Sequence, residues 1–313
     1  MSMHIDMVGQ LPGNSAKSAK PLEWPTLGLL VLCYALWGLG TTGVAGISLP
    51  LGMVLVTLAA VLHSSLSHEA LHGHPTRWRA LNEALVFPAL TLVIPYRRFR
   101  DTHLAHHHDA ILTDPYDDPE SNYLEAGVWE RLSAPMRAVL SFNNRLIGRL
   151  LIGPLVGQVA FMVSDWRAIR GGDRKVLAGW LWHGPALALV VLWMAALGQM
   201  PLWAFLLSTY AALSILKIRT FLEHQAHLRA RGRTVIIEDR GLLALLFLNN
   251  NLHVVHHMHP KLPWYRLPKL YFGNRARYLA CNDAYMFPSY AEVFRRYLFK
   301  AKDTVPHPLW RRP

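Results

Sequence analysis

Two long stretches of the chain lack basic side chains, and they constrain the fold more than any other feature of the sequence. No lysine or arginine occurs at residues 21–76, and no charged residue of any kind occurs at residues 176–216. Basic residues are concentrated in the segments between and around them, within a formal net charge of +12. Alternation of uncharged apolar blocks with basic segments is typical of a polytopic membrane protein. We therefore expect an integral membrane protein and no binding of nucleic acid.

Each apolar block predicts two membrane-spanning helices. The first block contains the stretches 26–45 and 49–66, and the second contains the stretches 176–197 and 201–216, each pair being separated by a short break rich in glycine and proline. Each stretch is close to the ~20 residues that a helix needs to cross the hydrocarbon layer. The short breaks contain no lysine or arginine, so the positive-inside rule places both termini and the remaining loops in the cytoplasm, as in a bacterial inner membrane protein. The sequence thus predicts an all-α protein with four transmembrane helices in two hairpins.

Two further apolar segments, residues 85–94 and 147–163, are expected to be interfacial or re-entrant rather than spanning. The first is too short to cross and is broken by Pro88, whereas charged residues border the second. If the second segment crossed the membrane, it would also place the histidine motifs described below on opposite sides. Both segments are therefore assigned to the membrane surface.

The sequence indicates one membrane domain at residues 23–300, between a flexible N-terminal tail at residues 1–22 and a C-terminal tail at residues 301–313. The two cysteines, Cys33 and Cys281, belong to no paired motif. This excludes a disulfide framework, a zinc ribbon and an iron–sulfur ligand set.

Nine of the 17 histidines lie in motifs with helical spacing or just after the last apolar stretch. One motif has the spacing i, i+4, and two have the spacing i, i+3, i+4, so the imidazoles of each motif share one helix face. Neutral imidazole is a ligand for iron, zinc, copper or nickel, and nine exceed the needs of one ion, so we expect a pair of metals on the cytoplasmic side. In chain order the candidates are His68 and His72; His103, His106 and His107; His224; and His253, His256 and His257.

The remaining ionisable residues near these motifs are interpreted more conservatively. His108 and His227 adjoin candidate ligands and either hold a ligand's tautomer or are solvated. The acidic turn at residues 114–120 is expected to be a solvated loop, although it could supply partners for the ligands. Glu69, Asp101 and Glu223 are further candidate partners. Four histidines are assigned to packing or to the membrane interface: His63, His74, His183 and His259. Three arginines are expected to anchor lipid head groups rather than to dock an acidic redox partner: Arg97, Arg98 and Arg100.

The three motifs resemble the three histidine boxes of the membrane fatty acid desaturase superfamily. They read His-Glu-Ala-Leu-His at residues 68–72, His-Leu-Ala-His-His at residues 103–107 and His-Val-Val-His-His at residues 253–257. The stretch at residues 250–268 also resembles the family's third-box region, and the likeness covers roughly residues 50–270. It implies four membrane helices under a cytoplasmic helical cap that carries a histidine-ligated di-iron centre.

The same resemblance implies an oxidoreductase that uses O₂ and two external electrons. It assigns the eight motif histidines as iron ligands, and His224 matches an extra histidine of many members. Asn249 precedes His253 by one helical turn and is a further candidate partner of the ligands. No cytochrome b5 region or cysteine-based electron-transfer domain is found in the sequence, so a separate ferredoxin, rubredoxin or cytochrome b5 type donor is expected.

Desaturation of a fatty acyl lipid or an acyl carrier is the leading functional hypothesis. A carotenoid ketolase or hydroxylase is an alternative, because such enzymes resemble this chain in size and in the Pro-Trp-Tyr-Arg-Leu-Pro stretch at residues 263–268. A desaturase of a small amino-acid-like metabolite is another. The most distant alternatives are a metal-storing membrane scaffold and an intramembrane zinc protease. The protease would use His68, Glu69 and His72 as an H-E-x-x-H motif and leave the other two motifs unexplained.

Overall fold

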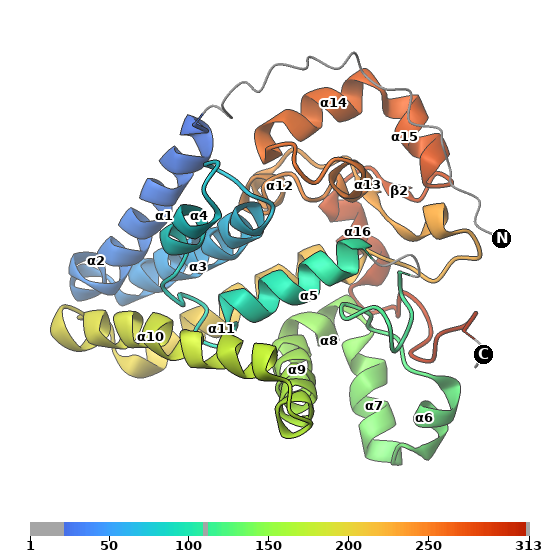
Figure 1. Cartoon of the computed structure of the whole chain (residues 1–313), viewed down its shortest axis with the longest axis horizontal. Helices are drawn as coiled ribbons and strands as arrows, with labels where there is room; N and C mark the ends of the chain where they lie inside the picture. Colours follow the sequence, from blue (N-terminus) through green and yellow to red (C-terminus); the bar gives the residue numbers. More distant parts are fainter. Residues whose placement is uncertain (1–21, 109–111, 311–313) are drawn as a thin grey trace.

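The computed structural model describes residues 22–108 and 112–310, and this part of the chain is mostly helical (Figure 1). The flexible N-terminal tail was expected at residues 1–22, and residues 1–21 of it lie outside the described residues. Within the described part, four helical segments are long and apolar enough to cross a membrane. They are Trp24–Ile47, Leu49–Leu71, Arg174–Ala196 and Leu202–Phe221.

The four segments confirm the expected all-α membrane protein with four candidate spanning helices. The first comprises α1 (Trp24–Thr41) and α2 (Gly43–Ile47), and the others are α3 (Leu49–Leu71), α10 (Arg174–Ala196) and α11 (Leu202–Phe221). Local sequence explains the helix starts. Pro50 lies in the first turn of α3, where its missing N–H costs nothing, and the Asp173 side chain accepts hydrogen bonds from the first N–H groups of α10.

Helix α3 is the centre of the membrane region, because it packs against α1 on one side and α11 on another. Helices α1 and α3 approach closely at Gly40 and Gly52. A Cβ atom at Gly52 would lie 2.8 Å from the backbone oxygen of Gly40, so only glycine fits there. Among the described residues, α10 packs chiefly against α5 and α9 rather than along α11. The pairing of α10 with α11 as a hairpin therefore stays a prediction.

Six helices lie between the two pairs of candidate spans. Residues 85–94 contain only the last residue of a short helix and then irregular backbone, and α9 is not among the four candidate spans, since it ends in charged residues. The expected assignment of both segments to the membrane surface stays a prediction. The six helices are α4 (Arg79–Leu85), α5 (Tyr96–His108), α6 (Ala126–Arg131), α7 (Ala134–Asn143), α8 (Leu146–Leu151) and α9 (Gly153–Arg170).

The last third of the chain forms short helices and one two-stranded parallel sheet that gather at the end of the molecule away from α2 (Figure 1). The elements are η1 (Ala230–Arg233), β1 (Ile236–Ile237), α12 (Leu242–Leu246), α13 (His253–Met258), η2 (Trp264–Arg266), α14 (Leu267–Gly273), α15 (Arg275–Cys281), β2 (Met286–Phe287) and α16 (Tyr290–Tyr297). Residues 301–310 run back along the domain, where the backbone N–H of Lys302 bonds Asn144 and that of His307 bonds Leu124. The expected division into one domain and two tails stays a prediction.

Candidate metal centre

All nine histidines singled out by spacing lie together, and they divide into two groups. Within each group, one ring nitrogen of every member lies within 4.8 Å of the others. The groups abut, because the rings of His107 and His257, one from each group, stack with their centroids 4.2 Å apart. Group 1 consists of His68, His72, His103, His107 and His256, and group 2 of His106, His224, His253 and His257.

Three helices bring eight of these side chains together, and the ninth, His224, follows the end of α11. The end of α3 carries the first motif, α5 carries the second and α13 carries the third. The i, i+4 pair of α5, His103 and His107, enters group 1, whereas His106 between them enters group 2. Helix α13 does the reverse, since its i, i+4 pair enters group 2 and His256 enters group 1. Each of these motifs therefore serves both groups rather than one ion alone.

The Nε2 atoms within the groups are spaced as ligands of a common ion would be. The Nε2 atom of His103 lies 2.9 Å from that of His68 and 3.0 Å from that of His107, and in group 2 the Nε2 atoms of His106 and His224 are 2.9 Å apart. Nitrogens that bind one ion at about 2.1 Å and at right angles lie about 3 Å apart. In group 1 the Nε2 atom of His72 is buried without a hydrogen-bond partner among the described residues. The residues present therefore fit a metal ion in each group.

Carboxylates fix the tautomers of two of these histidines. His106 donates from Nδ1 to Asp118 Oδ1 at 2.7 Å, and His103 donates from Nδ1 to Glu120 Oε1 at 2.8 Å. A proton held on Nδ1 leaves the lone pair on Nε2, which faces the group in both cases. In group 2, His253 donates from Nδ1 to Asn250 Oδ1 at 3.2 Å. These contacts prepare the imidazoles for metal binding.

Burial keeps most of these imidazoles neutral. It lowers the pKa values of all three α13 histidines and of His224 well below the usual histidine range, with repulsion from neighbouring imidazoles adding to the effect. The pKa of His107 falls to about 3 for the same two reasons. Burial also opposes protonation of His106, but the hydrogen bond that His106 donates to Asp118 and the charge of Glu120 outweigh it and raise the pKa to about 9. A bound cation would replace that proton.

The acidic turn is where the sequence-based interpretation fails. Asp118 is buried and Glu120 is only partly exposed, and each bonds a histidine of the centre. Asp118 also accepts the backbone N–H groups of Thr113 and Glu120. Asn250 was also missed. In the sequence, these partners of the histidines were indicated only by the acidic, proline-containing composition of residues 114–120 and by the run of asparagines before the third motif.

Of the four partners of the ligands proposed outside the acidic turn, Asp101 pairs with Arg100 and Lys175, and the other three lie at different places. Glu223 accepts a hydrogen bond from Asn250 Nδ2 at 2.9 Å, and Asn250 in turn contacts His253. Glu69 accepts the backbone N–H of Trp264, whereas the Asn249 amide donates to the Trp264 carbonyl. Of the three, Glu223 is thus linked to the centre through Asn250.

The histidines expected outside the centre lie outside both groups. His108 is exposed, and His227 contacts the backbone of Arg229. His183 donates to the Leu92 carbonyl, and His259 contacts Tyr278. His63 and His74 are buried in contact with Tyr34 and Glu23 respectively.

The three arginines before the second motif are held by acids of the protein itself. Arg98 forms two hydrogen bonds with Asp165, both at 2.8 Å. Arg97 and Arg100 both bond Glu83. These contacts place α5 against α4 and α9, so the expectation of lipid anchoring leaves out the principal role of these side chains.

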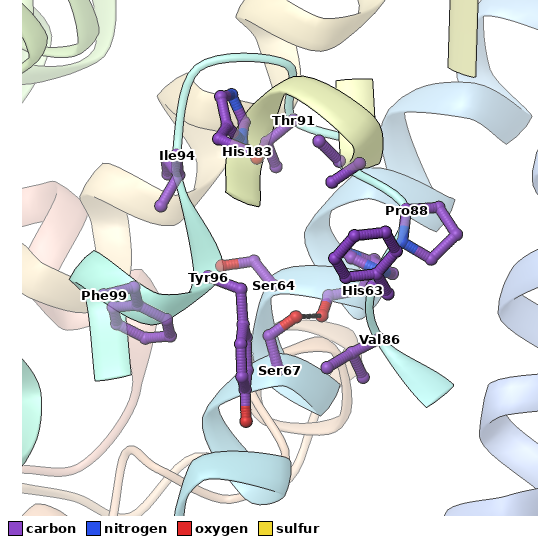
Figure 2. A pocket seen from close by; sticks show the side chains of 13 residues that line it. His63, Ser64, Ser67, Val86, Pro88, Thr91, Ile94, Tyr96, Phe99 and His183 are labelled. Carbon is purple, nitrogen blue, oxygen red and sulfur yellow. Dashed lines mark hydrogen bonds between the residues drawn. The ribbon is translucent and has the colours of Figure 1, made fainter. Parts of the chain in front are cut away.

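A narrow pocket of about 30 Å³ lies beside group 1, between α3, residues 86–94, α5 and α10 (Figure 2). Figure 2 shows Tyr96 and Phe99 at one side of the pocket, with Val86 and Pro88 across from them and Ser64 and Ser67 between. The Phe99 ring also contacts His68 and His103. The pocket therefore lies next to the metal centre, separated from it by Phe99.

Four helices that could cross a membrane, together with two histidine groups that fit metal ions, are features of a membrane protein with a metal site. The family model for fatty acid desaturases matches residues 45–289, most of the chain, and the chain belongs to this family. It is therefore an oxidoreductase of the desaturase type, as its histidine motifs predicted. A comparison with curated proteins finds no match.

Proposed function

We propose that this protein is an O₂-dependent, di-iron desaturase that introduces a carbon–carbon double bond into a fatty acyl chain. The observation that carries the proposal is the division of nine imidazoles into two adjoining groups, one for each ion. Family membership supports iron and desaturation. The active site and both termini are proposed to lie in the cytoplasm, where a separate ferredoxin, rubredoxin or cytochrome b5 type protein would supply two electrons.

In this proposal group 1 and group 2 hold one iron each. The bound irons would supply the activation of O₂ and the removal of hydrogen from an unactivated carbon. The protein's own contribution is to hold the Nε2 atoms of His106, His103 and His253 in place, through the contacts of Asp118, Glu120 and Asn250 with the opposite ring nitrogens. The burial of the histidines excludes bulk water from the reaction.

The acyl chain is proposed to approach through the pocket of Figure 2. Its walls include Val86, Phe87, Pro88 and Ile94, which suit a hydrocarbon chain. A cavity of about 30 Å³ holds roughly one water-sized group. Entry of the chain therefore requires these side chains to move apart, with Phe99 nearest to the metal ligands.

The zinc-protease alternative receives no support from the structure. Its catalytic base would be Glu69, whose carboxylate accepts the Trp264 backbone N–H. The two motif histidines, His68 and His72, lie among three more imidazoles rather than in an open three-ligand site. Membership of the desaturase family also assigns the chain to a different chemistry.

The test is turnover by the purified, iron-loaded protein. The assay contains O₂ and a ferredoxin with its reductase. Acyl-CoA, acylated acyl carrier protein and phospholipid are tested in turn as the acyl donor, and the products are analysed by mass spectrometry. We expect about two irons per chain and a product lighter by two hydrogens. His256→Ala should abolish turnover, while His108→Ala, an exposed neighbour of the second motif, should retain it. Zinc as the bound metal, or no O₂ uptake with any acyl donor, would refute the proposal.

A further inference from the structure

A second cavity, of about 210 Å³, lies beside group 2 and differs in character from the pocket of Figure 2. It lies between the N-terminal half of α5, residues 113–123 and the C-terminal end of α11, and His224 of group 2 forms part of its wall. Six ionisable side chains besides this histidine line it: Asp118, Glu120, Lys217, Arg219, Glu223 and Lys302. Such a wall is unsuited to a hydrocarbon chain.

Arg219 has an unusual position in this wall. The residue is only 8% exposed, and its Nε and Nη1 atoms are buried without a hydrogen-bond partner. The closest carboxylate oxygen is Glu223 Oε1, 3.4 Å from Nε. Within residues 22–108 and 112–310 the guanidinium makes no hydrogen bond. Arg219 is therefore paired with Glu223 by charge, but its buried N–H groups lack acceptors, which is costly for a guanidinium in a protein interior.

The other ionisable groups of the wall are already engaged, with one exception. The acids accept hydrogen bonds: Asp118 from His106, Glu120 from His103 and Glu223 from Asn250. Lys302 donates to the carbonyl oxygens of Phe221 and His224 at 2.8 and 2.9 Å. Lys217 is the exception, because it forms no hydrogen bond with any described residue. The cavity therefore has donors to spare, and the spare donors are cationic.

We propose that this cavity binds a carboxylate anion, held by the guanidinium of Arg219 and the ammonium group of Lys217. The planar fork of a guanidinium matches a carboxylate and can donate two parallel hydrogen bonds to it. The polar side chains of Ser121, Asn122 and Thr220 provide the remaining lining. Because the cavity is smaller than the ~300 Å³ of a typical small-molecule site, it takes a short carboxylate or only the carboxylate end of a longer molecule.

Binding can be measured without turnover on the iron-loaded protein in detergent, by thermal unfolding in sodium acetate against sodium chloride at equal ionic strength. The wild type should show a saturable rise in Tm with acetate. The apparent acetate affinity should fall at least tenfold in Arg219→Gln and several-fold in Lys217→Gln. Arg229→Gln changes an exposed arginine whose partner is Asp283, and it should respond to acetate as the wild type does.

The variants separate this site from the metals, because acetate bound to iron alone would stabilise Arg219→Gln as much as the wild type. That result, or a linear response equal to that of chloride, would overturn the proposal. If Arg219→Gln does not fold, unchanged acetate affinity in Lys217→Gln would overturn it equally.

The carboxylate has two possible sources, a substrate that is presented as a free fatty acid rather than as an ester or thioester, or a free small acid, and kinetics with a free fatty acid distinguish them. Acetate that raises KM without changing kcat would identify the substrate's own carboxylate as the natural occupant. Acetate that binds without affecting KM would identify a free acid. The site does not depend on the proposed reaction, since acetate binding is measured whether or not any acyl donor is turned over.

Discussion

Replacement of Asp118 by asparagine should weaken metal binding in group 2 while leaving group 1 intact. The carboxylate holds the His106 ring by a 2.7 Å hydrogen bond, and both of its oxygens are fixed by backbone N–H groups. Removing such a partner from a metal ligand typically lowers affinity 10–100-fold, or about 1.4–2.7 kcal/mol. Iron content after dialysis against a graded series of chelator concentrations should fall in two steps, with the step of group 2 shifted by that factor.

The neighbouring variant Asp117→Asn is a matched control. Asp117 is exposed, and its only described hydrogen bond is made by its backbone N–H to Asp114. It should therefore retain iron as the wild type does. A single unshifted curve for Asp118→Asn would refute the argument that the acidic turn supports the centre. Equal loss of both irons would refute the independence of the two groups.

Three further results are expected. Glu120→Gln should weaken iron binding in group 1 by a similar 10–100-fold factor, because Glu120 holds the ring of His103. Loss of the group 2 iron before the group 1 iron during dialysis of this variant would contradict the prediction. Gly52→Ala should destabilise the helix pair by about 1–3 kcal/mol, since its Cβ would meet a backbone oxygen at 2.8 Å, whereas Gly28→Ala faces open space and should leave Tm unchanged. Metal-free protein should lose stability as the pH falls through 6.5. The unfolded chain takes up protons there, but the α13 histidines of the folded chain do not, because their pKa values are lowered. The loss of folding stability is about 1.4 kcal/mol per histidine at one pH unit below the ordinary histidine pKa of ~6.5. His106 has the opposite sign, since its raised pKa contributes stability that is lost between pH 6.5 and about 9. Thermal unfolding across pH 5.5–9 checks both signs, and a flat profile below 6.5 would contradict the first.

The membrane helices and the candidate ligands were predictable because both depend on local sequence. A helix that crosses hydrocarbon needs an uninterrupted apolar stretch, and the expected stretches agree with the four candidate spans, though α10 begins at Arg174 and α11 extends to Phe221. The ligand motifs are spaced at one helical turn, so the residues that face one another can be read from their numbers alone. Their meeting in space, between α3, α5 and α13, follows from tertiary packing, and it was expected from their common side of the predicted topology and from the family resemblance.

The contacts that support the histidines were not predictable in the same way. Asp118 lies 12 residues from His106, and Glu120 lies 17 residues from His103. Each carboxylate is brought back to α5 by the turn at residues 114–120, whose conformation depends on side-chain contacts such as that of Asp114 with Trp310. Composition alone makes such a segment look like a solvated loop, because acidic and proline residues are usually exposed.

The division of the histidines between the two groups follows from helix geometry once the helices are in place. Successive residues of a helix are rotated by about 100°, so His106 and His107 enter different groups although they are neighbours on α5. Helix α13 shows the converse arrangement with His256 and His257. Because each helix contributes to both groups, a displacement of either one disturbs both sites together. The spacing of the two groups is therefore set by helices α5 and α13, while Asp118 and Glu120 orient individual rings through hydrogen bonds.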